Sequence, residues 1–555
     1  MALARVACCA ALVVFAACEP LADAAPDLSA DRLLADIQVL AADSLEGRAP
    51  GTPGEEKTVR YLEAQFRAAG LAPGNPDGTF TQAVEMVGIT GTAAANVAIG
   101  TTPIPLVFGD DYVLSSRRTV PEVVVPPSEI VFVGYGVEAP EYSWNDFKDV
   151  DVRGKVILML VGDPAVPSAA NPAVLDTAMF RGPAMTYYGR WTYKYEIASA
   201  KGAAGAIIIH DDAAAGYGWG VVKGSWSGRE LIDLRSADNN AGRVAVEGWM
   251  TSPKASELFR TAGLDLDSLR RVAVTPAFRP VSLSGTAAFR ITQQVRDIRS
   301  RNVVARLPGS DPALADEHVI FTAHWDHLGI VTPVNGDSIA NGARDNASGT
   351  AGIVELARAF ATAGAPKRSL LFLAVTAEES GLLGAKWYAE HPLYPLERTV
   401  ANINVDVLNA WGPTSDITVV GLGNTTLEDV LREVAQVEGR TVLGDSEPEK
   451  GFFYRSDHFE FAKKGVPALY VDEGKSYLDR PPEYGEQHNR RWLDSLYHQP
   501  ADSVEPGWDL RGAINDLTLL YRVGRKVADA EVWPAWKPGT EFKAIREQML
   551  GAGNR

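Results

Sequence analysis

The second half of the chain alternates between short apolar runs typical of buried strands and amphipathic segments typical of helices. The alternation begins near Asn302 and continues beyond residue 471. Strands that alternate with helices form a largely parallel sheet with helices on both faces. We therefore expect an α/β fold with a mixed, largely parallel sheet flanked by helices. The expected strands span residues 319–322, 370–376, 403–407 and 468–471, and the expected helices span 350–361, 382–389 and 427–437.

Polar residues lie where these strands end. His324 follows the first strand, Glu378 and Glu379 follow the second, and Asp406 lies at the end of the third. Asp345 lies in a loop that opens the next helix. Because sites in open α/β sheets form outside the carboxyl ends of the strands, we expect these side chains to meet at one edge of the sheet.

Several acids at one edge would repel each other and lose hydration unless a cation held them together. The only cysteines are Cys8, Cys9 and Cys18, so a metal bound by the rest of the chain must use His, Asp and Glu. This donor set suits Zn²⁺ or a similar divalent ion. The acids outnumber the needs of one open tetrahedral site, which favours two ions about 3.5–4 Å apart.

These residues resemble the motifs of the co-catalytic zinc aminopeptidases. The wider clan also includes the glutamate carboxypeptidase II-like enzymes, the glutaminyl cyclases and the non-enzymatic transferrin receptor. The resemblance extends from about residue 28 to residue 527, and its five motifs follow the family's order. They are Ala323-His324-Trp325-Asp326, Asp345-Asn346-Ala347-Ser348-Gly349, Glu378-Glu379, Asn404-Val405-Asp406 and Tyr497-His498. The resemblance implies a zinc exopeptidase-like fold with two zinc ions per chain.

The resemblance also implies a role for each ligand. Asp345 would bridge both ions. His324 and Asp406 would complete one ion, and Glu379 and His498 would complete the other.

Other roles follow from the same resemblance. Glu378 would stay uncoordinated and act as general base on a hydrolytic water held between the metals. Asp326 would orient the imidazole of His324. Tyr454 and Arg455, in Tyr454-Arg455-Ser456-Asp457-His458, are candidate donors to the oxyanion of the tetrahedral intermediate.

An aminopeptidase also needs an acid that receives the substrate ammonium. Asp472 and Glu473, just after the strand over 468–471, are the candidates. We interpret His327 as a supporting or packing residue, Asp457 and His458 as residues that hold a loop together, and Asp502 as a residue that orients the loop of His498.

The first part of the chain predicts two further regions. Two helical patterns, over 33–41 and 59–69, flank an ordered turn region at 47–54, and Gly70 is placed as a C-cap. Residues 128–290 show short β-type runs, one helical pattern over 193–203 and a single histidine, His210. We expect a β-rich accessory domain without catalytic groups, which resembles a protease-associated domain. It would divide the catalytic domain into residues 25–127 and 291–555.

The N-terminus has the pattern of a targeting signal. Arg5 precedes an apolar run over 6–17, and Ala22-Asp23-Ala24 follows, which is typical of a secretory signal peptide that we assign to residues 1–24. Phe15-Ala16-Ala17-Cys18 resembles a bacterial lipoprotein box, which would place a lipid anchor on Cys18. We therefore expect export, to the periplasm as a free or lipid-anchored protein or to the medium.

The charge balance narrows the class of partner. Lys and Arg number 53 against 70 Asp and Glu, a net charge of -17, which argues against nucleic acid or an anionic membrane as a main partner. We predict a dinuclear zinc aminopeptidase that removes N-terminal residues from peptides. The alternatives are a carboxypeptidase of the glutamate carboxypeptidase II type, which would need a positive cluster near the metals, and a glutaminyl cyclase, which normally uses one metal. A metal-free receptor-type protein should have lost ligands, yet all five positions are filled.

Overall fold

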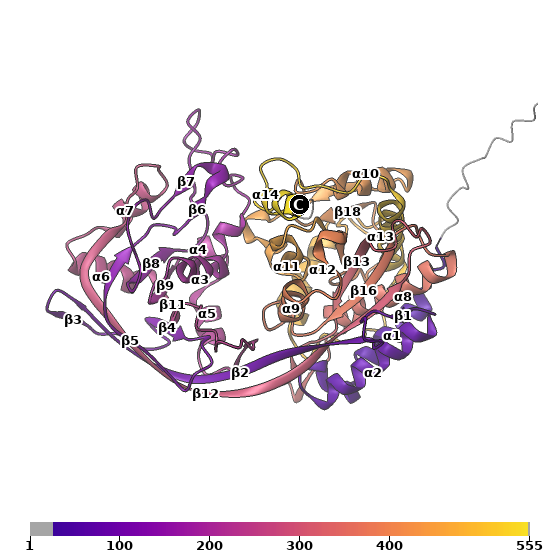
Figure 1. The fold of residues 1–555 in the computed structure, drawn as a ribbon, viewed down its shortest axis with the longest axis horizontal. Helices are drawn as coiled ribbons and strands as arrows, with labels where there is room; N and C mark the ends of the chain where they lie inside the picture. Colours follow the sequence, from indigo (N-terminus) through magenta and orange to yellow (C-terminus); the bar gives the residue numbers. More distant parts are fainter. Residues whose placement is uncertain (1–25, 553–555) are drawn as a thin grey trace, which may run out of the picture.

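The computed structural model describes residues 26–552 and shows two lobes joined by a pair of long antiparallel strands (Figure 1). These strands are β2 (Thr81–Ile99) and β12 (Val281–Leu307), which pair from Thr81 opposite Val303 to Ile99 opposite Gly285. Because both strands run through both lobes, the smaller lobe is an insertion into the larger one. The expected signal peptide and the Cys18 anchor lie outside the described residues.

The larger lobe is built on a mixed sheet with parallel strands at its centre. β13 pairs in parallel with β16 and with β17, and β20 pairs in parallel with β17. Antiparallel pairs flank this centre, β12 with β16 and β18 with β20, and β19 then adds in parallel to β18. The predicted mixed, largely parallel sheet is confirmed. Its strands are β13 (His318–His324), β16 (Ser369–Val375), β17 (Thr399–Asn404), β18 (Asp416–Val419), β19 (Thr441–Gly444) and β20 (Ala468–Asp472).

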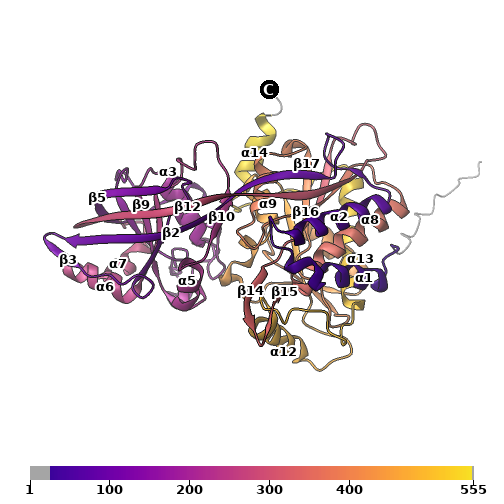
Figure 2. The same ribbon diagram turned by 90° about the horizontal axis from the view of Figure 1, so that it is seen from below.

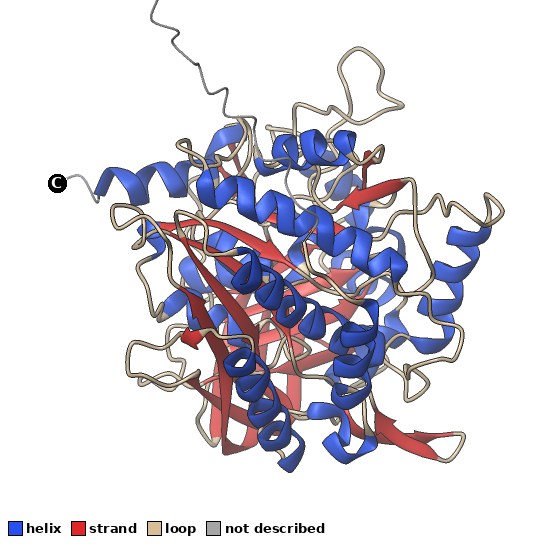
Figure 3. Cartoon of the chain, turned by 90° about the vertical axis from the view of Figure 1, so that its right-hand side faces the viewer, coloured by secondary structure: helices blue, strands red, loops and turns tan. Residues whose placement is uncertain are grey.

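Helices cover both faces of this sheet (Figures 2 and 3). α1, α2, α8 and α13 pack against one another on one face, and α9 and α11 pack on the other. All seven residues of β13 are buried, which is why apolar residues follow one another at Val319, Ile320 and Phe321 without alternation. The helices of this lobe are α1 (Ala30–Leu40), α2 (Pro53–Ala68), α8 (Gly349–Ala363), α9 (Leu383–Glu390), α10 (Leu427–Val437), α11 (His458–Lys463), α12 (Tyr484–Arg491), α13 (Arg511–Asp529) and α14 (Lys543–Ala552).

The two N-terminal helices are capped by side chains at their first turns, and glycine follows the second helix as predicted. The side chain of Ser29 accepts the backbone N–H of Arg32 at the start of α1, and Thr52 accepts that of Glu55 at the start of α2. Gly70 follows α2 with a φ of +84°, a left-handed conformation that favours glycine. No helix among residues 26–552 is both long and apolar enough to cross a membrane.

The smaller lobe contains its own parallel strands as well as helices. β5, β8, β9 and β11 pair in parallel in that order, and β4 adds antiparallel to β11. The lobe takes in β3, β4 and the distal part of β2, all of which precede residue 128. Its assignment as a protease-associated domain stays a prediction. Its elements are β3 (Thr102–Ile104), β4 (Tyr112–Ser115), β5 (Glu122–Phe132), β6 (Glu138–Ala139), β7 (Trp144–Asn145), β8 (Val156–Leu160), β9 (Gly205–His210), β11 (Val246–Thr251), α3 (Trp191–Ala200), α4 (Asp212–Ala215), α5 (Trp219–Trp226), α6 (Ser252–Thr261) and α7 (Leu266–Ala273).

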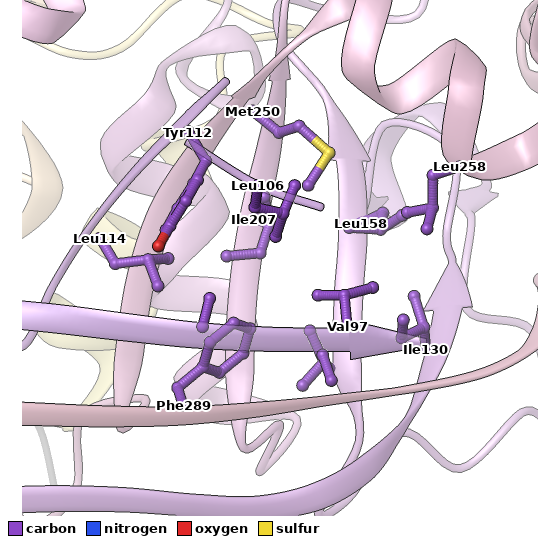
Figure 4. A pocket seen from close by; sticks show the side chains of 13 residues that line it. Val97, Leu106, Tyr112, Leu114, Ile130, Leu158, Ile207, Met250, Leu258 and Phe289 are labelled. Carbon is purple, nitrogen blue, oxygen red and sulfur yellow. The ribbon is translucent and has the colours of Figure 1, made fainter. Parts of the chain in front are cut away.

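A cavity lies in the core of the smaller lobe, between the long strands and the parallel ones (Figure 4). Val97 and Phe289 face it from one side, and Leu158 and Ile207 face it from the other. Apart from the hydroxyl of Tyr112, the side chains that line it are apolar. The cavity therefore offers no group for peptide chemistry. Four short strands complete the fold outside this lobe's core: β1 (Ala72–Pro73) on β12, β10 (Leu231–Leu234) on β2, and the hairpin of β14 (Gly329–Val334) with β15 (Asp337–Ala340).

Candidate metal centre

The five predicted ligands meet at the carboxyl edge of the parallel strands. His324 is the last residue of β13, and Asp406 lies two residues beyond β17. Glu379 lies in the turn after β16, and Asp345 lies in the segment Ala343–Ser348 that leads into α8. His498 comes from a distant loop that follows residues 492–496. The chain therefore brings together residues more than 170 positions apart.

The distances divide these ligands into two sets of three. Nε2 of His324 lies 3.3 Å from Oδ1 of Asp345 and 3.3 Å from Oδ1 of Asp406. Nε2 of His498 lies 3.2 Å from Oδ2 of Asp345 and 3.0 Å from Oε2 of Glu379. Two ligands bound at about 2.0–2.1 Å to a tetrahedral ion are about 3.3 Å apart, so these spacings fit Zn²⁺. The donor set is nitrogen and carboxylate oxygen, as the absence of cysteine in this region predicted.

The carboxylates of the centre also favour positive charge on the groups around them. Burial opposes protonation of His498, but the carboxylates of Glu379 and Asp345 raise its pKa to about 10. Burial likewise opposes charge on His324, whereas Glu378 and Asp406 raise its pKa well above the ordinary value. The acids therefore favour positive charge at this centre, and bound metal ions would supply it.

Glu378 lies beside both sets without belonging to either. Its Oε2 is 4.0 Å from Nε2 of His324, and its side chain is 12% exposed. The turn that presents Glu378 and Glu379 is strained, since Ala377 and Leu382 have φ values of +54° and +61°. An acid held this close, and still reachable by solvent, fits the role of general base.

Several residues hold the ligands in place. Nδ1 of His327 lies 2.6 Å from Oε1 of Glu379, on the oxygen that His498 does not contact. Asp502 accepts the backbone N–H groups of Arg344 and Asp345 at 2.9 and 3.0 Å. His327 thus contacts a ligand, as we expected of a supporting residue. The carboxylate of Asp502 holds the loop of Asp345 and not the loop of His498 that we expected it to orient.

Asp326 contacts His324 through its main chain and not through its carboxylate. Nδ1 of His324 lies 3.2 Å from the backbone carbonyl of Asp326 and 3.9 Å from its Oδ1, which is too long for a hydrogen bond. The Asp326 carboxylate instead accepts the backbone N–H of Glu378 at 3.1 Å. The residue adjoins both His324 and the predicted base, but different atoms make the two contacts.

Four of the predicted substrate-binding residues have other partners. The Tyr454 hydroxyl donates to Oε1 of Glu541 at 2.7 Å, and Nη2 of Arg455 donates to the carbonyl of Lys450 at 2.6 Å. The Tyr454 hydroxyl and this Arg455 nitrogen are therefore engaged with other protein groups, and no local sequence pattern predicted that Glu541 folds back beside Tyr454.

The acids at the end of β20 are engaged as well. Oε2 of Glu473 forms an ion pair of 2.9 Å with Arg344, so its charge is neutralised. Oδ1 of Asp472 accepts the backbone N–H of Glu473 at 2.7 Å. Of the two, Glu473 is thus poorly suited to receive a substrate ammonium.

Two residues that contact the ligands were not predicted from the sequence to be functional. The Ser456 hydroxyl donates to Oδ2 of Asp406 at 2.6 Å and accepts from the side chain of Asn404 at 2.7 Å. The ring of Tyr497 stacks on that of His498, with centroids 3.8 Å apart. Both lie inside segments that carry other candidate site residues, and nothing else in the sequence indicated a functional role for them.

Similar proteins were found among known families, sequences and structures. The model of peptidase family M28 matches residues 302–521. A probable zinc metalloprotease of Pyrenophora tritici-repentis is 33% identical over 343 residues, which cover 52% of this chain and 67% of that protein. Aminopeptidase YwaD of Bacillus subtilis is 29% identical over 236 residues, which cover 42% of this chain but only 44% of the relative. An aminopeptidase structure from Aneurinibacillus sp. strain AM-1 is similar over 92% of this chain and 95% of its own, with 20% identity and a TM-score of 0.47. The match to the fungal metalloprotease and the family motifs in one centre establish that the chain belongs to peptidase family M28.

Proposed function

We propose that the protein is an exported aminopeptidase that uses two zinc ions to hydrolyse N-terminal residues from peptides. The observation that carries this proposal is that the two carboxylate oxygens of Asp345 lie beside different ligand sets. Its Oδ1 lies beside His324, and its Oδ2 lies beside His498, so one carboxylate serves two ligand sets. A single ion would use only one of these sets, and the two further donors of the other set would have no metal to bind.

The ligand residues would hold the ions in two sets, His324 with Asp406 and His498 with Glu379, joined by Asp345. When bound, the ions would supply Lewis-acid activation of the hydrolytic water and of the scissile carbonyl. Glu378 would accept a proton from the water and pass it to the leaving amine. His498 is 34% exposed whereas His324 is 1% exposed, so we infer that substrate approaches from the side of His498.

Two observations favour an aminopeptidase over the alternatives. The paired sets around Asp345 speak against a one-metal cyclase. A carboxypeptidase would need an unpaired positive cluster, but Arg344, the buried arginine next to Asp345, is paired with Glu473.

A panel of aminoacyl chromogenic substrates tests the proposed reaction. We expect free aminoacyl substrates to be cleaved, their N-acetylated forms to be cleaved at least tenfold more slowly, and all cleavage to stop with a chelator and return with Zn²⁺. Equal cleavage of blocked and free substrates would exclude an aminopeptidase. Cleavage that survives complete metal removal would exclude metal-dependent hydrolysis altogether.

Export is proposed from the N-terminal sequence alone. The apolar run over 6–17 and the small residues after it support cleavage by a signal peptidase, and Cys18 is the site where a lipid would be attached. We expect the mature protein in the periplasmic or membrane fraction of the native cell, with an acylated Cys18 in the second case. Recovery of an uncleaved chain from the cytosol would contradict export.

A further inference from the structure

A single buried arginine joins the N-terminal segment to two of the ligand loops. The side chain of Arg48 is completely buried and donates only to backbone carbonyls. Nε donates to Trp325 at 2.7 Å, Nη1 donates to Leu40 and to Asn341 at 2.6 Å each, and Nη2 donates to Gly342 at 2.9 Å. A guanidinium can meet four carbonyls at once because its donors form a rigid, planar fork.

The positions of these carbonyls connect Arg48 with the metal centre. Trp325 directly follows the ligand His324. Asn341 and Gly342 immediately precede the segment that carries Asp345. Leu40 is the last residue of α1. One side chain therefore joins the end of α1 to the loop of the ligand His324 and to the loop of the bridging residue Asp345.

Further contacts clamp the same segments together. The side-chain amide of Asn341 donates to the Ala41 carbonyl and to Oδ1 of Asp43, both at 2.8 Å. At Gly47 a Cβ would lie 2.5 Å from the carbonyl oxygen of Ala340 and 2.7 Å from that of Gly329. Only glycine permits this approach. The segment over residues 40–49 is thus fitted closely against the ligand loops.

The backbone around Arg48 is held in an unfavourable conformation. Glu46 and Arg48 both have a φ of +53°, in the left-handed region that residues with a Cβ rarely adopt. Such a turn persists only where its surroundings hold it. The carbonyls that Arg48 reaches provide those surroundings, so the turn and the loops stabilise each other.

The charge of Arg48 also acts on the centre. Burial lowers the pKa of Arg48 to about 10, and nearby carboxylates oppose that shift, so the side chain remains a cation at neutral pH. These carboxylates are those of Asp502, Asp326, Asp345 and Glu379. No carboxylate forms a direct ion pair with Arg48 among the described residues. The cation therefore supports the whole acidic cluster without competing for any ligand.

We propose that Arg48 is a positioning residue for the metal centre, and that docking of residues 40–49 is thermodynamically coupled to metal binding. The inference rests on the proposed metal-dependent function. Coupling is reciprocal: if the docked segment strengthens metal binding, bound metal must strengthen docking by the same factor. The loops of His324 and Asp345 are the elements that both events fix in one arrangement.

A second buried arginine provides a control that distinguishes an effect on metal binding from an effect on general stability. Arg368 is also buried, with 2% exposure, and its Nη1 donates to the carbonyls of Val527 and Ala528 at 3.3 and 3.4 Å and to that of Ala530. Unlike Arg48, it also forms an ion pair, in which its Nε lies 2.6 Å from Oε2 of Glu317. It lies just before β16, whereas the metal ligands lie beyond the far end of that strand. Arg368→Met thus removes a comparable buried fork without touching a ligand loop.

The first experiment measures Zn²⁺ affinity of metal-free full-length protein by competition with a chromophoric chelator. We expect Arg48→Met to weaken at least one site by about 10–100-fold, the usual effect of losing an outer partner of a metal ligand. Arg48→Lys keeps the charge but not the fork, and we expect it to remain at least tenfold weaker than wild type. Arg368→Met should lower the melting temperature yet keep the affinity within about threefold.

Several outcomes would overturn the proposal. Wild-type affinity in Arg48→Met, full recovery by Lys, or an equal loss in Arg368→Met would each reduce Arg48 to an ordinary packing residue. Zinc binding by the wild type together with any of these results leaves the proposed function standing. A wild-type protein that binds no Zn²⁺ would instead contradict both.

A second experiment needs no variant and therefore does not depend on mutant folding. Amide hydrogen exchange of the wild type is compared with Zn²⁺ and after chelation. We expect residues 40–49 to exchange at least several-fold faster without metal, while α7 in the smaller lobe stays unchanged. Equal exchange of residues 40–49 in both states would overturn the coupling.

Discussion

Glu378→Ala is expected to lower kcat by about 10²–10⁴-fold or more while both metal ions remain bound. Glu378 lies 4.0 Å from Nε2 of His324 but belongs to neither ligand set, so its loss removes a proton acceptor and no ligand. Steady-state kinetics on an aminoacyl substrate, with metal content measured by elemental analysis on the same sample, checks both parts.

The conservative variant Glu378→Gln keeps the shape of the side chain and should lose activity to a similar degree. Retention of most activity in either variant would remove Glu378 from the role of base. Loss of metal along with activity would show that Glu378 is a ligand.

Glu379→Ala is expected to have the opposite effect on metal content. Oε2 of Glu379 lies 3.0 Å from Nε2 of His498, and Oε1 lies 2.6 Å from Nδ1 of His327. Removing this carboxylate takes one donor from the second set and leaves His327 without its partner. We expect occupancy to fall from about two ions per chain towards one, with activity lost as a consequence.

Elemental analysis after dialysis measures this occupancy, and the adjacent Glu378→Ala variant is the matched control. Two ions per chain in Glu379→Ala would contradict its assignment as a ligand. The two substitutions differ by one position, so a shared effect on folding would act on both and could not produce opposite metal contents.

The clustering of the ligands could be predicted because it follows from the topology. In a parallel sheet, the carboxyl ends of neighbouring strands lie at the same edge. β13, β16 and β17 are such neighbours, so His324, Glu379 and Asp406 had to meet. His498 follows no strand of the sheet, and only its motif indicated that it would join the others.

Contacts between side chains from distant segments were less predictable. Tyr454 was a reasonable oxyanion donor from its motif, but its partner Glu541 lies 87 residues away. Glu473 follows a strand as an ammonium-binding acid should, yet Arg344 already neutralises it. In both cases the residue type and its place after a strand or in a motif suited the predicted role. Its actual partner was set by packing against a distant segment, which no local pattern encodes.

By itself the sequence determined the α/β class, the edge of the sheet where the acids gather and the identity of the five candidate ligands. The class and the edge of the sheet depend on the periodicity of apolar residues, and the ligands were identified by the motifs that resemble those of the family; both signals are local in the chain. The tertiary structure decided which atom of Asp326 meets His324, and that the turn at Gly47 and Arg48 closes over the ligand loops. Those contacts depend on differences of a few tenths of an ångström in the positions of packed groups. Such differences are settled only when the whole core packs.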